Sequence, residues 1–138
     1  MADHKVTTRF IGGMTFQSKL DNHTIIIDTP EDDGGNDLGP RPKKLMLSSL
    51  AGCTGIDVVS MLKKMRVDFS NFSMDVEANL TKEPPTVYTW VKITYKIQVK
   101  DEDKEKVEKA VHLSKDKYCG VSAMFEKFAD VEFAIEYL

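Results

Sequence analysis

Residues 45–62, LMLSSLAGCTGIDVVSML, carry apolar side chains on nearly every side of a helix, and this pattern sets the architecture expected for the chain. Pro42 stands where a helix can begin, and basic residues follow at the far end, so the sequence predicts a helix over residues 43–66. The small residues between the large ones would let other backbones approach closely. A helix that is apolar all round is buried all round. We therefore expect this helix to lie at the centre of the protein.

Short strands are predicted before this helix. Residues 6–16 contain apolar side chains broken by Gly12 and Gly13, which predicts a hairpin or two strands around a turn. Residues 23–28 are rich in β-branched side chains and predict another strand. Residues 30–42 have turn residues and no apolar periodicity, so we expect a loop there.

Regular alternation of apolar and polar residues follows the helix. Residues 72–80 and residues 91–99 alternate strictly, as half-buried antiparallel strands do. Residues 101–118 form a charged amphipathic pattern typical of a helix, and a second helix is expected from Cys119 to about Phe128. Residues 131–137 alternate again and predict a final strand.

Together these elements predict an α+β protein in which antiparallel sheets wrap around the central helix, as a single domain over residues 1–138. One sheet covers only one side of a helix, and a chain of 138 residues has little material left for the other side. A second copy of the chain would cover it. We therefore expect a homodimer with the helix near the shared core.

Composition excludes several classes of function. Nineteen basic and 22 acidic residues give a net charge of −3, which argues against nucleic acid or anionic lipid as a partner held by charge. The longest uncharged apolar-rich run, residues 45–56, is shorter than a membrane-spanning helix. No signal peptide is evident, so the cytoplasm is the expected location. Two cysteines are too few for a disulfide scaffold.

The two cysteines have different sequence contexts. Cys53 lies inside the apolar helix, where a buried thiol usually acts as an inert small hydrophobic group. Cys119 lies at the break between two helices, where a helix N-terminus can stabilise a thiolate, or where a small residue can simply fill a corner. Their separation excludes a local CxxC motif. If the fold brings them together, one thiol can attack an oxidant and the other can close a disulfide.

Other candidate groups carry less chemistry. Asp57 lies one turn after Cys53 on the same helical face, and a structural ion pair or hydrogen bond is its expected role. His4, His23 and His112 have no ligand spacing, so the sequence predicts no metal site. No phosphate-cradling glycine motif is present, and no cofactor is expected.

Two segments resemble the OsmC/Ohr family of thiol-dependent peroxidases, and most closely its YhfA-like branch of redox proteins. GPRPKKLMLSSLAGCTGIDVVSMLKK resembles the first-cysteine helix, and LSKDKYCGVSAMFEK resembles the second-cysteine segment. The resemblance implies an intertwined homodimer. It also implies that Cys53 is the peroxidatic thiol, that Cys119 is the resolving thiol, and that an external dithiol reductant restores both. Organic hydroperoxides are the substrates that the resemblance implies.

The sequence departs from the family at two places. The peroxidatic members place a glutamate after the proline that opens the cysteine helix, whereas Lys43 and Lys44 stand here. Those members also use an arginine from the N-terminal strands, whereas GGMTFQSKLDNHTIIID contains none and Lys19 is its only lysine. A lysine does not replace a bidentate guanidinium. Arg41, Lys43, Lys44 or Arg9 could supply the charge instead.

The resulting hypothesis is a thiol-dependent organic hydroperoxide reductase with Cys53 and Cys119 as its catalytic pair. Because the arginine and the glutamate are unmatched, two alternatives stand on the same scaffold. One is a protein that binds a small apolar ligand without turnover. The other is a thiol redox sensor that forms the disulfide slowly.

Overall fold

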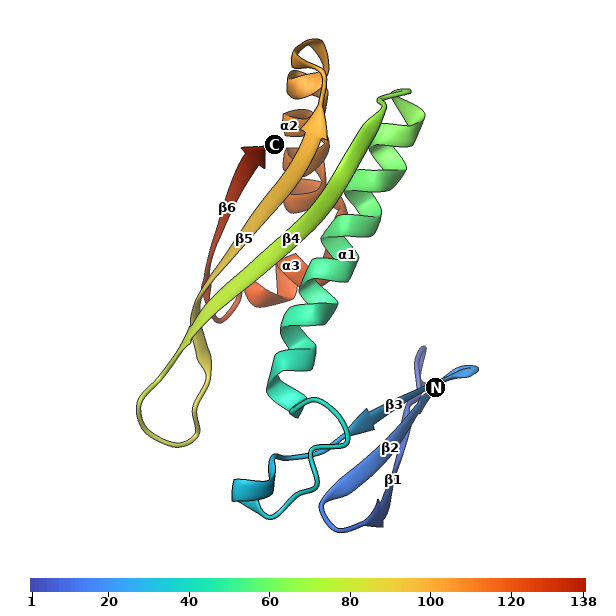
Figure 1. The fold of residues 1–138 in the computed structure, drawn as a ribbon, viewed down its shortest axis with the longest axis vertical. Coiled ribbons are helices and arrows are strands. Elements are labelled where there is room, and N and C mark those ends of the chain that lie inside the picture. Colours follow the sequence, from blue (N-terminus) through green and yellow to red (C-terminus); the bar gives the residue numbers. More distant parts are fainter. The chain divides into compact units, whose positions relative to one another are not determined.

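The computed structural model describes residues 1–138, which divide into two compact units, residues 1–46 and residues 47–138. Each unit contains one three-stranded sheet (Figure 1). The expectation of a mixed α+β fold is confirmed, since strands alternate with three α-helices along the chain.

The first unit is an antiparallel sheet in the order β1-β2-β3. Its strands are β1 (Thr7–Gly12), β2 (Thr15–Leu20) and β3 (His23–Ile27). Gly12 and Gly13 both have positive φ and form the turn between β1 and β2, as the sequence predicts. The predicted loop that follows contains one short 3₁₀ turn, η1 (Glu31–Asp33).

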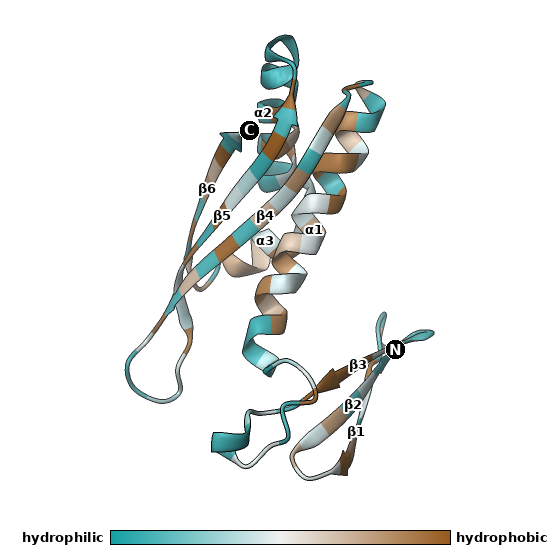
Figure 2. Ribbon diagram, in the orientation of Figure 1, coloured by the Kyte–Doolittle hydropathy of each residue, from teal (hydrophilic) through white to brown (hydrophobic).

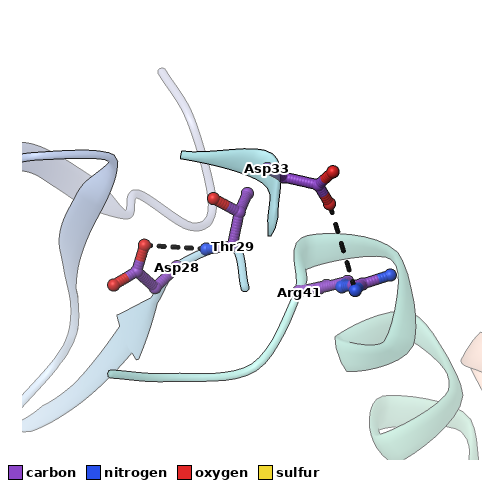
Figure 3. Close-up of polar contacts among 4 residues, drawn as sticks. All are labelled: Asp28, Thr29, Asp33 and Arg41. Carbon is purple, nitrogen blue, oxygen red and sulfur yellow. Dashed lines mark hydrogen bonds and ion pairs between the residues drawn. The ribbon is translucent and has the colours of Figure 1, made fainter. Parts of the chain in front are cut away.

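The interior of the first unit is polar and is organised by Asp28. This side chain is 1% exposed and accepts hydrogen bonds from Thr15 Oγ1 at 2.9 Å and from the backbone N–H groups of Thr29 and Leu38 at 2.7 and 3.2 Å. Figure 3 draws the bond to Thr29. Although burial raises the pKa of Asp28, these hydrogen bonds together hold it below its ordinary value.

Helix α1 (Pro42–Lys64) begins at the predicted proline and ends with a Schellman motif. Arg66 has the left-handed φ of 58°. Its N–H donates to the Lys63 carbonyl at 3.1 Å, and the N–H of Val67 donates to the Leu62 carbonyl at 2.9 Å. Because Val67 and Leu62 both belong to the hydrophobic core, the same turn that ends the helix also anchors it.

Within the chain, α1 is buried along one stripe and not on all sides. The fully buried residues of the helix are Leu50, Thr54, Gly55, Val58 and Leu62. Ile56 on another side is 72% exposed, because the single sheet of this unit covers only one flank of α1. Figure 2 shows that apolar residues recur along α1 and that polar residues lie at its two ends. The expectation of a helix buried all round therefore fails for the chain by itself.

By length and composition, α1 qualifies as a membrane-spanning helix, with 28% of its most apolar 18-residue window buried in the protein. The sequence-based exclusion of any such stretch was therefore too strict, because it ended the apolar run at Asp57. The core helices of many soluble proteins also meet these criteria of length and composition.

The second unit has a sheet in the order β4-β5-β6, and helices connect two of its strands. Strands β4 (Phe69–Leu80) and β5 (Tyr88–Val99) are antiparallel, as predicted. Between β5 and β6 the chain forms a 3₁₀ turn, two helices and a π-helical turn: η2 (Asp101–Asp103), α2 (Lys104–Leu113), η3 (Ser114–Tyr118) and α3 (Gly120–Phe125). The two helices expected here are confirmed, with the π-helical turn between them.

The last strand, β6 (Asp130–Tyr137), pairs with β5 in parallel, for instance Ile93 opposite Phe133. The expectation of purely antiparallel sheets is wrong at this point. A helical crossover carries the chain back to the end of the sheet where β5 began, and a strand that starts there runs parallel to β5.

The hydrophobic core lies in the second unit, between one face of this sheet and the helices. Strand β5 contributes Val91, Ile93, Tyr95 and Ile97, all fully buried. Facing them are Leu50, Val58 and Leu62 of α1, Val107, Ala110 and Val111 of α2, and Phe125 of α3. This packing brings α1 and the α2–α3 segment to the same face of β5, which places the two cysteine-bearing segments in one neighbourhood.

Candidate functional site

The two cysteines, 66 residues apart in the chain, meet in the second unit. The Sγ atoms of Cys53 on α1 and Cys119 at the start of α3, together with a carboxylate oxygen of Asp57, all lie within 4.8 Å of one another. Both thiols are free. Cys53 is half-buried, whereas Cys119 is only 3% exposed. The two sulfur atoms are therefore near enough to form a disulfide after a small movement, once an oxidant has reacted with one of them.

Local backbone geometry fixes the position of Cys119. The π-helical turn η3 ends at this residue, which has the extended backbone of a helix N-cap, and its N–H donates to the Ser114 carbonyl at 2.8 Å. Its Sγ accepts a hydrogen bond from the Ser122 N–H at 3.2 Å. The sulfur thus caps α3 and is held toward α1.

The thiol of Cys119 is a weak acid in this environment. Burial, the hydrogen bond with Cys53 and the nearby Asp57 carboxylate raise the pKa of Cys119 to about 11, and the Ser122 N–H lowers it only in part. Thiolate stabilisation by the start of α3, one of two readings of the sequence, is therefore outweighed by burial. At neutral pH Cys119 keeps its proton.

A buried chain of hydroxyl groups leads to Asp57. Ser114 Oγ donates to Asp57 Oδ2 at 2.9 Å and lies 3.1 Å from Thr54 Oγ1, which in turn is hydrogen-bonded to the Tyr95 hydroxyl. A carboxylate only accepts hydrogen bonds, so the proton of Ser114 points to Asp57. Ser114 then accepts from Thr54, and Thr54 accepts from Tyr95. The expected structural hydrogen bond of Asp57 is confirmed.

Tyr95 anchors this chain in the core. Burial raises the pKa of Tyr95 to about 12, so the hydroxyl keeps the proton that it donates to Thr54. Tyr95, Thr54 and Ser114 are each completely buried. Such a network is rigid when every hydroxyl group in it has a hydrogen-bond partner. It holds the Asp57 carboxylate in one orientation beside the thiols.

The sequence alone did not indicate Thr54, Tyr95 or Ser114 as parts of the site. One signal was available: Tyr95 lies between Ile93 and Ile97 on the buried face of a strand, and a buried tyrosine hydroxyl needs a partner. Thr54 and Ser114 gave no such signal, because small hydroxyl residues are common in helices.

The cations that could replace the family's arginine belong to the first unit, and the arginine of the second unit lies far from the thiols. Arg66 is the one arginine of residues 47–138, and it ends α1 about 20 Å along the helix from Cys53. In the first unit, Arg9 hydrogen-bonds to Gln17 at 3.5 Å, and Arg41 pairs with Asp33 at 4.0 Å (Figure 3). No guanidinium of the second unit therefore contacts the thiol pair.

Two cavities lie along α1 in the second unit. The larger, of about 600 Å³, is mostly apolar and is lined by residues of α1 and β4: Gly52, Gly55, Ile56, Val59, Ser60, Lys63, Phe72 and Met74. The smaller, of about 470 Å³, is lined by Asp57, Ser60, Met61, Lys64 and Tyr118. Asp57, Met61 and Lys64 share a helix face with Cys53, so the smaller cavity lies on the cysteine side of α1.

Comparison with known proteins identifies the family of this chain. The family described as OsmC-like protein matches residues 34–134. Protein YhfA of Escherichia coli strain K12 is 30% identical over 129 residues, which are 93% of each chain. A hypothetical protein from Aquifex aeolicus VF5 is 27% identical with a TM-score of 0.85, covering 100% of this chain and 98% of that one.

A structure named as the organic hydroperoxide resistance protein OhrB of Bacillus subtilis has the same fold, with a TM-score of 0.61 and 22% identity over 96% of each chain. At that identity the likeness concerns the fold alone. The family match spans both cysteine segments and most of the chain. The protein described here belongs to the OsmC-like family.

Proposed function

We propose that the protein is a thiol-dependent hydroperoxide reductase in which Cys53 is the peroxidatic thiol and Cys119 is the resolving thiol. The observation that carries this proposal is the approach of the two sulfur atoms, within 4.8 Å, from helices that are distant in the sequence. Two buried structural cysteines need no such proximity. A disulfide requires the sulfurs to close to about 2.05 Å, which is a movement of side chains and not of domains.

The assignment of roles follows from exposure and acidity. Cys53 is the more accessible thiol, and an oxidant from solvent reaches it first. Cys119 is buried and, with a pKa of about 11, keeps its proton at neutral pH. A protonated thiol is a poor nucleophile toward peroxide. Cys119 therefore acts second, on a sulfur that is already oxidised.

The proposed reaction has two steps. The Cys53 thiolate attacks the outer oxygen of ROOH, the O–O bond breaks, and with one proton the products are the Cys53 sulfenic acid and ROH. The sulfur of Cys119 then attacks the sulfenic sulfur, a disulfide forms, and water leaves with the Cys119 proton. An external dithiol reduces the disulfide and restores both thiols.

An apolar cavity lies along the helix that carries Cys53, on another face of that helix from the thiol pair. The cavity of about 600 Å³ beside Gly52 and Gly55 is lined mainly by carbon atoms, and a site of that size accommodates a small organic ligand. An alkyl or aryl group would gain by leaving water there, whereas hydrogen peroxide would not. We infer a preference for organic hydroperoxides from the family resemblance, and this cavity offers room for an apolar group elsewhere on α1.

A homodimer belongs to the same proposal. Several large apolar side chains are exposed on the chain by itself: Phe10, Ile11, Met14, Phe16 and Ile56 are between 39% and 72% exposed. Exposed apolar groups in such number favour an interface. A second copy that covers α1 would also complete the burial expected for the central helix.

The activity is tested by peroxide consumption with a dithiol as reductant. We expect the wild-type chain to consume cumene hydroperoxide catalytically and faster than hydrogen peroxide, and Cys53→Ser to lose the activity. Cys119→Ser should react once and stop, leaving a sulfenic acid that a dimedone probe traps at Cys53. Consumption by the wild type no faster than by Cys53→Ser would rule the reductase out.

The apolar cavity favours a second candidate, a protein that binds a small apolar molecule without turnover. Native mass spectrometry of the purified protein separates the two. A bound apolar ligand that persists in Cys53→Ser, in a protein without peroxide turnover, identifies the binding protein. Release of that ligand by Val59→Asp, which places a charge in the cavity wall, locates it there.

A further inference from the structure

The cluster of Cys53, Asp57 and Cys119 has a second chemical capacity that involves no oxidant. Its two sulfur atoms and one carboxylate oxygen converge within 4.8 Å from two segments of the second unit. These atom types in one place are a ligand set for a metal ion. Their burial is graded, since Cys119 is buried while Cys53 and Asp57 are partly open to solvent.

The donor atoms select a thiophilic cation. Two thiolates and one carboxylate are ligands that Zn²⁺ takes readily, whereas Mg²⁺ and Ca²⁺ prefer oxygen alone. In a tetrahedral zinc site, with Zn–S bonds of about 2.3 Å, neighbouring sulfur atoms lie roughly 3.8 Å apart. The two Sγ atoms here lie at most 4.8 Å apart, which is about 1 Å more than in such a site. Rotation of the side chains can close this difference.

The surroundings of Asp57 orient a metal ligand. Ser114 donates to Asp57 Oδ2 at 2.9 Å, and Ser114 is itself held by the buried Thr54 and Tyr95 hydroxyls. Outer hydrogen bonds of this kind fix the direction of a coordinating carboxylate and raise metal affinity. The carboxylate retains its other oxygen and further lone pairs for a cation.

We propose that Cys53 Sγ, Cys119 Sγ and the Asp57 carboxylate bind Zn²⁺ as three protein ligands. The fourth position is filled by water or a small solute, for which the cavity of about 470 Å³ beside Asp57 has room. On binding, both thiols lose their protons to solvent, and no electrons are transferred. This site goes beyond the proposed peroxide reduction.

The proposed zinc site and the proposed disulfide use the same two sulfur atoms. A sulfur that is part of a Cys53–Cys119 disulfide has no thiolate to offer, so the zinc-bound and disulfide states exclude each other. Zinc would therefore protect the pair from oxidation, and oxidation would release zinc.

The test uses the full-length, reduced, metal-free protein without oxygen. Titration with Cd²⁺, which gives ultraviolet thiolate-to-metal charge-transfer absorption, should saturate at one ion per chain. The absorption should be lost or greatly reduced in Cys53→Ser and in Cys119→Ala, the alanine being chosen because Cys119 is buried. Circular dichroism checks that each variant is folded. Histidine sites on the surface give no thiolate absorption.

Competition with a chromophoric chelator then gives the Zn²⁺ affinity. Asp57→Asn should weaken it by more than tenfold, and Ser114→Ala, which removes only the outer hydrogen bond, by about tenfold. Asp68→Asn is the matched control, because Asp68 is an exposed aspartate outside the cluster, and it should leave the affinity unchanged.

The proposal is overturned if the reduced protein gives no thiolate-to-cadmium absorption, if the absorption persists in Cys119→Ala, or if Asp57→Asn binds Zn²⁺ as tightly as Asp68→Asn. These outcomes are independent of catalysis. A protein that consumes peroxide but binds no Cd²⁺ refutes only the metal site, and one that binds Cd²⁺ but consumes no peroxide refutes only the reductase.

Discussion

Residues 1–46 and residues 47–138 both contain a three-stranded sheet, but they bury different kinds of side chain. In the first unit the buried side chains are Thr15, Ser18 and Asp28, all polar, and Phe10 and Phe16 lie on the surface. In the second unit every buried position of β5 is aliphatic or a tyrosine, namely Tyr88 or Tyr95.

The two units are therefore stabilised in different ways. The second unit has a hydrophobic core of its own. One face of its sheet packs there against α1, which precedes β4 in the chain, and against α2 and α3, which follow β5. The first unit is held by backbone pairing and by the hydrogen bonds of Asp28, and units of this size rarely bury enough apolar surface by themselves. Its exposed apolar side chains are consistent with the proposed covering by a second copy.

The largest effect is expected for a matched pair of leucines. Leu50→Ala, at a fully buried position of α1, should lower the free energy of unfolding by about 2–5 kcal/mol, because it removes core contacts and leaves a cavity. Leu38→Ala, at a position that is 65% exposed in the first unit, should change it by no more than about 0.5 kcal/mol. Urea unfolding measures both, and equal losses would contradict the distinction between the units.

The next effect concerns association. Phe16→Asp replaces an apolar side chain of β2 that is 39% exposed in the chain with a charged one, and we expect it to raise the dissociation constant of the proposed dimer by about tenfold or more. Gln17→Asp adds the same charge on the opposite face of the strand and is the control. Sedimentation velocity over a range of concentrations measures the change. A dimer equally stable in both variants would place the interface elsewhere.

A smaller effect should appear as a pH dependence of the first unit. Because hydrogen bonds hold the pKa of Asp28 below its ordinary value, its stabilising contribution is complete above about pH 4, the ordinary value. It is lost as the pH falls through the lower folded value. We expect Asp28→Asn to be less stable than the wild type at pH 7 and to lose less stability between pH 7 and pH 3. If the urea midpoints of the wild type and of Asp28→Asn changed equally with pH, this role of Asp28 would be refuted.

The smallest effect tests the packing of α1 against β4. Gly52→Ala adds a methyl group into open space on a helix and should stabilise the protein by about 0.5–1 kcal/mol. At Gly55 the added carbon would lie 2.5 Å from the terminal methyl of Met74, so that flexible side chain must move. Gly55→Ala should therefore gain less than Gly52→Ala. Thermal unfolding compares the two, and a larger gain at Gly55 would mean that Met74 packs loosely.

Much of the fold was predictable from local patterns. The alternation in residues 72–80 and 91–99 predicted β4 and β5, and Pro42 with the basic residues after Met61 predicted the limits of α1. The parallel pairing of β6 was not predictable, because alternation shows which face of a strand is buried and not which way the strand runs. The incomplete burial of α1 was not predictable either, because it depends on which other elements pack against the helix.

The two cysteines of the candidate site were predictable from the sequence, but the geometry that brings them together was not. Sequence patterns and a family resemblance indicated Cys53 and Cys119, yet no local rule relates two positions 66 residues apart. Their approach depends on α1 and α3 packing on the same face of β5. The raised pKa of Cys119 likewise depends on burial and on Asp57, whereas its place at a helix start suggested the opposite.

The proposed chemistry requires that the fold brings the thiols of Cys53 and Cys119 within reacting distance. The most direct measurement is non-reducing peptide mapping by mass spectrometry after one equivalent of cumene hydroperoxide is added to the reduced protein. We expect a single linkage, Cys53 to Cys119 within one chain, with the loss of two hydrogen atoms. Two unlinked cysteines, or a linkage only between cysteines of different chains, would contradict it.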